Sequence, residues 1–345
     1  MSRKNGSIGE MIRPVTTCVL VAVAVGVVGT IAGGQSTPGV PAAVRQKNAA
    51  GATKEQFERW MTDLTNWGRW GKDDQLGTAN LYTVEKRKQA LALAKTGTTV
   101  SLGHDVADEK GSDTNNPFAL KMIISPDPPL VRDRLDLDYH GGFFTHLDAV
   151  CHVVYQDRIF NGLDFRQTIT QDGCARLAIT GLKDGIATRA VLIDVPRLRG
   201  VPYLEPGTRV YREDIEEWER KAGVKVGAGD ALLIRTGRWP RRAKVGVTPG
   251  AGMDASFLPF LKDRDVALFG SDTAHEVPEN VPGLNMTVIH KFTVVARGMN
   301  LLDNLDLEAA ADTAARLKRW EFMLTVSPLR IPKGTGSPIN PIAFF

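Results

Sequence analysis

The sequence predicts a mixed α/β fold in one domain. Segments with helical spacing of apolar residues alternate along the chain with short apolar runs of strand length, and no internal repeat is present. The 345 residues are 43% hydrophobic and 24% charged, which is ordinary for a globular protein with a buried core. The formal net charge of +4 is small and no basic tract is interleaved with aromatic residues, so nothing indicates nucleic-acid binding.

Residues 1–34 have the pattern of an export signal. A net-basic segment precedes an uncharged, mainly apolar run over 15–32, and small residues follow up to Gly34. We expect cleavage near Gly34 and export to the periplasm or the extracellular space. An uncleaved membrane anchor is the alternative, because the apolar run is long enough to be borderline. Residues 35–52 are small and contain Pro and Gly, which predicts a flexible leader before a domain over 53–345.

The predicted elements alternate along this domain. Apolar residues at helical spacing predict helices over 53–64, 83–93, 212–221 and 307–317, the first with Thr53 as its N-cap. Short apolar runs predict strands over 98–102, 190–195, 229–236, 266–272 and 320–326. Residues 66–74 and 105–120 show no such pattern and are expected to be loops.

The stretch Tyr139–His152 (YHGGFFTHLDAVCH) is the densest in metal-binding groups, with three of the six histidines and a carboxylate. In a strand, His146 and Asp148 point to one face because they are two residues apart. An imidazole beside a carboxylate suits a divalent metal such as Zn²⁺ or Mn²⁺, and His152 could reach the same point. Ordinary polar residues on a strand face are the alternative, but the clustering favours a metal site.

Two cysteines remain after the predicted cleavage, Cys151 and Cys174. An exported protein could pair them. However, Cys151 lies between Asp148 and His152, where a buried thiol packed behind the site is the simpler interpretation. We therefore expect no disulfide.

The motif Thr145–His152 (THLDAVCH) resembles the signature of the metal-dependent cyclase family, which includes kynurenine formamidase and isatin hydrolase. Other stretches resemble the longer bacterial branch of that family, namely residues 67–74, 155–162, 229–237, 270–273, 301–308 and 334–341. The resemblance implies a swivelling β/β/α fold and hydrolysis of an amide-type C–N bond by metal-activated water. It also implies a small-molecule substrate, such as a formamide or lactam, and a homodimer.

The resemblance implies roles for particular residues. His146 and Asp148 match metal ligands, and Asp148 could bridge two ions. His152 matches the residue that handles protons as general acid and base. His290 aligns with a more distant histidine ligand, and Asp303 stands where the short-form enzymes use Glu.

Two positions depart from the short-form pattern. Gly142 stands where that signature has its first histidine, and His140 is the nearest substitute as a metal ligand. Asp303 reaches one methylene less far than Glu. Without the resemblance, His290 would be interpreted as a core histidine because its neighbours are apolar, and Asp303 as a cap for the helix that begins near Asp306.

Three functions fit this pattern. The first is an arylformamidase-like, metal-dependent hydrolase; the second is a lyase or cyclase that uses the same metal site on a small carbonyl substrate; the third is a non-catalytic exported metal- or ligand-binding protein. Nucleophilic catalysis by Ser271 lacks a motif that would place an oriented base beside it. His104 and His275 have no assigned role, although His275 could touch the substrate if its loop folds over the site. The Trp-rich segment near 60–70 is a candidate dimer contact.

Overall fold

The structure is a computed structural model that describes residues 51–108, 110–114, 116–247, 250–284 and 287–345. The predicted signal and nearly all of the predicted leader lie outside the described residues, so both stay predictions. Among the helices of the described ranges, none is long and apolar enough to cross a membrane.

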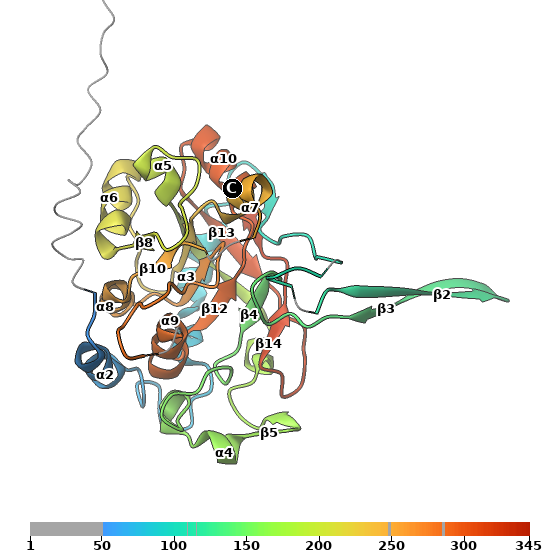
Figure 1. Cartoon of the computed structure of the whole chain (residues 1–345), viewed down its shortest axis with the longest axis horizontal. Helices are drawn as coiled ribbons and strands as arrows, with labels where there is room; N and C mark the ends of the chain where they lie inside the picture. Colours follow the sequence, from blue (N-terminus) through green and yellow to red (C-terminus); the bar gives the residue numbers. More distant parts are fainter. Residues whose placement is uncertain (1–50, 109, 115, 248–249, 285–286) are drawn as a thin grey trace, which may run out of the picture. The chain divides into compact units, whose positions relative to one another are not determined.

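A mixed sheet of nine strands forms the centre of the described residues (Figure 1). Across the sheet the strands are β1 (Thr99–Ser101), β15 (Ile342–Phe344), β13 (Glu321–Val326), β7 (Ile186–Asp194), β9 (Ala231–Arg235), β11 (Leu268–Ser271), β12 (Asn300–Asp303), β4 (His146–Asp148) and β14 (Gly336–Pro338). The four strands from β7 to β12 are parallel, and the strand pairs on both flanks are antiparallel. The parallel strands are largely buried, which explains apolar runs such as Val191–Ile193 in β7 and Ala231–Ile234 in β9. The predicted α/β fold is confirmed.

The described helices surround this sheet. They are α2 (Lys54–Asp63), α3 (Val84–Leu91), α4 (Phe165–Thr168), α5 (Val195–Arg199), α6 (Arg212–Ala222), α7 (Arg238–Val245), α8 (Leu258–Asp263), α9 (Val288–His290) and α10 (Glu308–Leu317). Thr53 caps α2 as predicted, because its hydroxyl accepts a hydrogen bond from the backbone N–H of Gln56, and the side-chain oxygen of Gln56 accepts one from the backbone N–H of Thr53. In α6 the predicted inward residue Trp218 is buried, and its indole donates to the carbonyl of Leu192 in β7.

The Trp-rich loop that follows α2 is bound to the body of the same chain. The indole of Trp67 donates to the carbonyl of Val295 over 2.8 Å, and its ring faces Gly162. Arg69 makes two hydrogen bonds of 2.6 Å to the carboxylate of Asp265. Trp67 and Arg69 of this loop therefore make their hydrogen bonds within the chain. The dimer contact expected here stays a prediction.

The segment after residue 118, which has no predicted element, forms a β-hairpin. It consists of β2 (Ala119–Pro126) and β3 (Pro129–Asp136), which pair with each other and project from the rest of the described domain (Figure 1). Nearly all of its side chains are exposed. The predicted loop over 105–120 is thus correct only up to residue 118. The alternation in β2 is hard to recognise because Ile123 and Ile124 interrupt it with consecutive apolar residues.

The expectation of two free cysteines is wrong. Cys151 and Cys174 form a disulfide, with their Cα atoms 6.5 Å apart. The small hairpin of β5 (Ile169–Thr170) and β6 (Gly173–Cys174) brings Cys174 back to the segment after β4, where the backbone of Cys174 also bonds to Lys333. This approach depends on contacts between distant segments, which the spacing of 23 residues did not reveal.

Candidate metal centre

Strand β4 carries the predicted motif into the sheet, between β12 and β14. The register of β4 and β12 places Asp303 directly opposite His146. Directly opposed residues of an antiparallel pair share one face of the sheet, and Asp148 shares that face because it is two residues from His146. The strand pairing therefore brings one imidazole and two carboxylates together.

Four predicted ligands converge at this face. His146 Nε2 lies 3.4 Å from Asp148 Oδ1 and 3.9 Å from Asp303 Oδ2. His290, at the end of α9, places its Nε2 3.4 Å from Asp303 Oδ2 and 3.8 Å from Asp148 Oδ2. One ligand atom each from His146, Asp148 and Asp303 can be chosen so that all lie within 4.8 Å of one another, which is close enough for a shared cation.

A second group shares Asp148. His140 Nδ1 lies 3.3 Å and His152 Nε2 lies 3.8 Å from Asp148 Oδ1. The two imidazole rings are stacked with centroids 4.1 Å apart. Gly336 leaves room for the His140 ring beside Asp148, since a Cβ at Gly336 would lie only 3.0 Å from His140 Cε1.

Two hydrogen bonds fix which imidazole nitrogen faces the carboxylates. His146 Nδ1 lies 2.8 Å from the carbonyl oxygen of Phe144, which can only accept, so Nδ1 carries a proton. His290 Nδ1 lies 3.0 Å from Glu276 Oε1, which also accepts from the backbone N–H of His290. Such bonds orient metal-binding histidines and leave Nε2 for the metal.

The carboxylates have unused capacity for a cation. Both oxygens of Asp148 are buried without a hydrogen bond among the described residues, and Asp303 Oδ1, also buried, has only the ring of His275 beside it at 2.8 Å. His140 Nδ1 and Glu276 Oε2 are unpartnered in the same way. Because buried polar atoms are nearly always paired, the donor set fits a divalent metal with nitrogen and oxygen ligands.

The pKa values of the histidines at this site are shifted in opposite directions. Burial lowers the pKa of His146, but the carboxylates of Asp148 and Asp303 outweigh it and raise that pKa to about 9. The pKa of His290 is also well above its ordinary value, because Asp303 and Glu276 outweigh burial. For His152, burial dominates and lowers the pKa to about 4. His152 is therefore neutral at pH 7, whereas His146 and His290 are positively charged imidazolium ions when no metal is bound.

His275, which has no assigned role from the sequence, contacts this group from behind. It is completely buried, and its Nε2 lies 2.8 Å from Asp303 Oδ1. Its Nδ1 lies 3.0 Å from the hydroxyl of Ser271. The four-residue spacing of Ser271 and His275 in the sequence is compatible with their contact. Nothing in the sequence relates either residue to Asp303.

The structure does not support nucleophilic catalysis by Ser271. An imidazole does stand beside its hydroxyl, contrary to the expectation, but Ser271 is completely buried and does not line the neighbouring cavity. The adjacent Asp272 accepts hydrogen bonds from the backbone N–H groups of Thr236, Gly237 and Arg238. It therefore stabilises the turn that begins α7.

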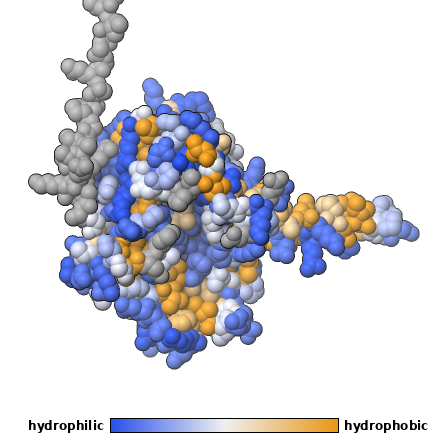
Figure 2. Space-filling model, viewed as in Figure 1, coloured by the Kyte–Doolittle hydropathy of each residue, from blue (hydrophilic) through white to orange (hydrophobic). Residues whose placement is uncertain are grey.

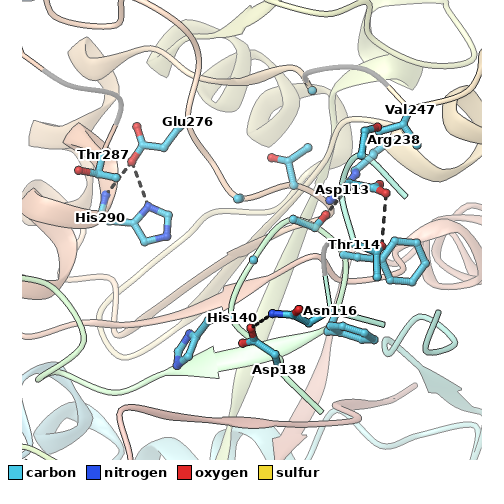
Figure 3. A pocket seen from close by; sticks show the side chains of 18 of the residues that line it. Asp113, Thr114, Asn116, Asp138, His140, Arg238, Val247, Glu276, Thr287 and His290 are labelled. Atoms are coloured by element: carbon cyan, nitrogen blue, oxygen red, sulfur yellow. Dashed lines mark hydrogen bonds and ion pairs between the residues drawn. The ribbon is translucent and has the colours of Figure 1, made fainter. Parts of the chain in front are cut away.

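A cavity of about 810 Å³ opens beside the metal-binding face. Figure 3 shows His290 with Glu276 at one part of its wall, His140 at another, and Asp113 beside Arg238 at a third. Small-molecule sites commonly measure about 300–1,000 Å³, so the cavity can hold a substrate beside the predicted ligands. His104 is not part of this wall, and its ring stacks on Trp239 with centroids 3.6 Å apart.

Comparison with known proteins agrees with this geometry. The family model described as "Putative cyclase" matches residues 100–275, which include β4 and its metal-binding motif. The chain belongs to the cyclase family. No curated protein sequence matches this cyclase-family chain.

Solved structures share the fold of this cyclase-family protein. A crystal structure described as a novel cyclase is 29% identical, with a TM-score of 0.74, and the match covers 83% of this chain and 99% of that one. Isatin hydrolase A from Labrenzia aggregata, bound to benzyl benzoate, is 20% identical, with a TM-score of 0.53 and coverage of 74% and 97%. An isatin hydrolase bound to the product analogue thioisatinate is 18% identical, with a TM-score of 0.51 and coverage of 76% and 98%. The cyclase-like fold implied by the sequence is confirmed.

Proposed function

We propose that this cyclase-family protein is a metal-dependent hydrolase that cleaves an amide-type C–N bond in a small molecule, such as a formamide or a lactam. The observation that carries the proposal is the convergence of the His146 and His290 imidazoles on the buried carboxylates of Asp148 and Asp303, beside a cavity of substrate size. Structures of isatin hydrolases, which share the fold, support this choice of reaction.

The residues suited to hold the metal are His146, Asp148, His290 and Asp303, with His140 on the other side of Asp148. When bound, Zn²⁺ or Mn²⁺ lowers the pKa of water towards about 7 and polarises a carbonyl group. Asp148 has His140 and His152 within 4 Å as well as His146 and His290, so it would be common to every ligand set that these residues can form.

His152 is the residue best suited to move the proton. Its Nε2 lies 3.8 Å from Asp148 Oδ1, beside the candidate ligands, and an imidazole nitrogen there can accept a proton from the attacking water. The same nitrogen can then return the proton to the leaving nitrogen, which departs as a neutral amine. Stacking on His140 and proximity to Asp148 hold the ring in place for both steps.

The test is metal content measured together with turnover. The purified protein is assayed for bound Zn and Mn, then with N-formylkynurenine, isatin and simple lactams, before and after treatment with a chelator. We expect hydrolysis of at least one compound, loss of activity on chelation, and recovery on adding one of the two metals. Stoichiometric metal without hydrolysis, but with addition or elimination of water on a carbonyl substrate, would instead establish a lyase or cyclase. Bound metal with no turnover of any compound on a broad substrate panel would instead favour a non-catalytic metal-binding protein.

A further inference from the structure

Arg238, the first residue of α7, places a cation in the wall of the cavity. It lies at a different part of the wall from His290 and Glu276 (Figure 3). Its side chain is only 14% exposed, and its guanidinium lies over the ring of Trp239, 4.6 Å from the ring centroid. Among the described residues that line this cavity, Arg238 is the only arginine or lysine. It is therefore the fixed positive charge that a ligand in the cavity would meet.

Two hydrogen bonds hold this guanidinium beside the candidate metal ligands. Its Nη1 donates to the side-chain oxygen of Asn304, and its Nη2 donates to the carbonyl oxygen of Gly142. Asn304 directly follows Asp303 in the chain, and Gly142 is two residues from His140. Both acceptors are neutral, so these bonds orient the cation without neutralising its charge.

The carboxylate nearest to Arg238 is shared with a second arginine. Arg242 donates to both oxygens of Asp113, over 3.0 and 3.1 Å. Arg238 reaches the same carboxylate only at 3.5 Å. Two guanidinium groups beside one carboxylate leave an excess of positive charge, and of the two arginines only Arg238 lines the cavity.

The other carboxylates near Arg238 already have partners. Asp272 accepts hydrogen bonds from the hydroxyl of Thr236 and from backbone N–H groups where α7 begins, and Asp303 belongs to the metal-binding group. Burial, together with the charge of Arg242, outweighs these carboxylates and lowers the pKa of Arg238 below its ordinary value. A buried cation in this situation would be stabilised by an anion.

The remaining acids of the wall are also engaged. Glu276 Oε1 accepts from both N–H groups of His290, and Asp138 accepts a hydrogen bond of 2.8 Å from Asn116. These carboxylates would repel a bound anion, whereas Arg238 would attract it. An anionic group in the cavity should therefore lie beside Arg238.

Apolar contacts for a ligand come from inside the cavity. Figure 2 shows hydrophobic side chains along the projecting arm, but no described residue of β2 or β3 lines the cavity. Phe143, Phe144 and Val247 do line it, and both phenylalanines are largely buried. The wall is thus suited to a small molecule with an apolar, flat body and one anionic group.

We propose that Arg238 binds a carboxylate of the ligand and so selects anionic small molecules for this cavity. A guanidinium has five N–H donors in a planar fork that matches a carboxylate. Its three bonds to Asn304, Gly142 and Asp113 leave two donors for a ligand. As a statement about the substrate, which would carry this carboxylate in addition to the C–N bond that is cleaved, the proposal rests on the proposed function. Binding of the anion does not.

The test compares the binding of benzoate with that of benzamide, which has nearly the same shape and no charge, by ligand-observed NMR titration at pH 7. The natural chain should bind benzoate roughly 10-fold or more tightly than benzamide, because charge-assisted hydrogen bonds are the stronger ones. Arg238→Gln should weaken benzoate binding by roughly 10–100-fold and leave benzamide binding nearly unchanged. Arg238→Lys keeps the charge without the planar fork, so its affinity for benzoate should lie between these values.

Arg241→Gln is the matched control. It removes the same charge from the same helix, at a side chain that is 13% exposed, bonds to Glu205 and does not line the cavity. This variant should bind benzoate like the natural chain. Asp113→Asn should have the opposite effect and tighten benzoate binding, because it removes the carboxylate that competes for Arg238. Mere damage to the cavity would weaken binding instead.

Equal affinity for benzoate in Arg238→Gln and in the control would overturn the proposal, as would equal affinity of the natural chain for benzoate and benzamide. Loss of benzoate binding when the natural chain is treated with a chelator would also overturn it and assign the anion to the metal. If Arg238→Gln does not fold, the sign of the change in Asp113→Asn decides the question. Benzoate binding without turnover of any compound would leave this site and remove the proposed function. Hydrolysis without any preference for anionic compounds would do the reverse.

Discussion

His152 and the ligand histidines should respond differently to substitution. We expect His152→Ala to lower turnover by about 10²–10⁴-fold while most of the metal is retained, because its proposed role is proton transfer and it belongs to the His140–Asp148–His152 group rather than to the His146–Asp148–Asp303 group. His146→Ala or Asp148→Ala should lose metal and activity together. Metal content and kcat measured on the same samples distinguish these results.

His104→Gln is the matched control for these substitutions, because His104 is a partly buried histidine that stacks on Trp239 away from the ligands. It should retain both metal and turnover. If His152→Ala emptied the site, the assigned proton-transfer role would be wrong and His152 would have to be counted as a ligand.

His275 is expected to act on the metal through Asp303. The imidazole lies 2.8 Å from Asp303 Oδ1, and removal of such an orienting partner typically weakens metal binding by about 10–100-fold. We predict this loss of affinity for His275→Phe and a smaller loss for Ser271→Ala, measured by competition with a chelator. Unchanged affinity in His275→Phe would show that Asp303 needs no such support.

Metal binding should release protons. In the metal-free protein the carboxylates hold the pKa of His146 at about 9 and that of His290 well above its usual range, so both rings are protonated at pH 7. Metal ligands must be deprotonated, and affinity should therefore fall as the pH drops below about 9, by about tenfold per pH unit for each proton displaced. Titration calorimetry in buffers of different ionisation enthalpy should count about two protons at pH 7. Binding without proton release would contradict this assignment.

At the scale of elements, the disulfide between Cys151 and Cys174 ties the segment of His152 to the β5–β6 hairpin. Closing a loop of 23 residues contributes roughly 3 kcal/mol to the free energy of unfolding. Replacing both cysteines by Ser should therefore lower the Tm by roughly 5 °C. A reductant should lower the Tm of the natural chain by the same amount and leave the double variant unchanged. A natural chain whose Tm is insensitive to reduction would count against a structural disulfide.

Most elements could be predicted from the sequence, because a capping residue such as Thr53 or an apolar run such as that of β9 acts locally. The pair His146 and Asp148 could be predicted for the same reason, since residues two apart on a strand share a face. Asp303 joins them only through the register of β4 and β12, and His275 only through a loop. Both depend on contacts between distant segments, as does the disulfide that was wrongly excluded.

At the scale of the whole molecule, the export prediction concerns residues outside the described ranges. We expect the full chain, produced in a host with a secretion apparatus, to yield a mature protein that begins near Gln35, because small residues follow the apolar run. Intact-mass measurement of the purified product checks this expectation. A chain of full mass that sediments with membranes would establish the anchor alternative.

Three of the candidate ligands differ from much of the cavity wall in the kind of backbone that carries them. His146, Asp148 and Asp303 belong to paired strands of the sheet, whereas Asp113, Glu276 and much of the remaining wall belong to connecting loops. Loops accept insertions and exchanges that a buried ladder does not. Laboratory evolution could therefore remodel what the cavity admits while leaving the reactive centre untouched, and chimaeras with grafted loops would be a practical way to obtain new selectivities on this scaffold.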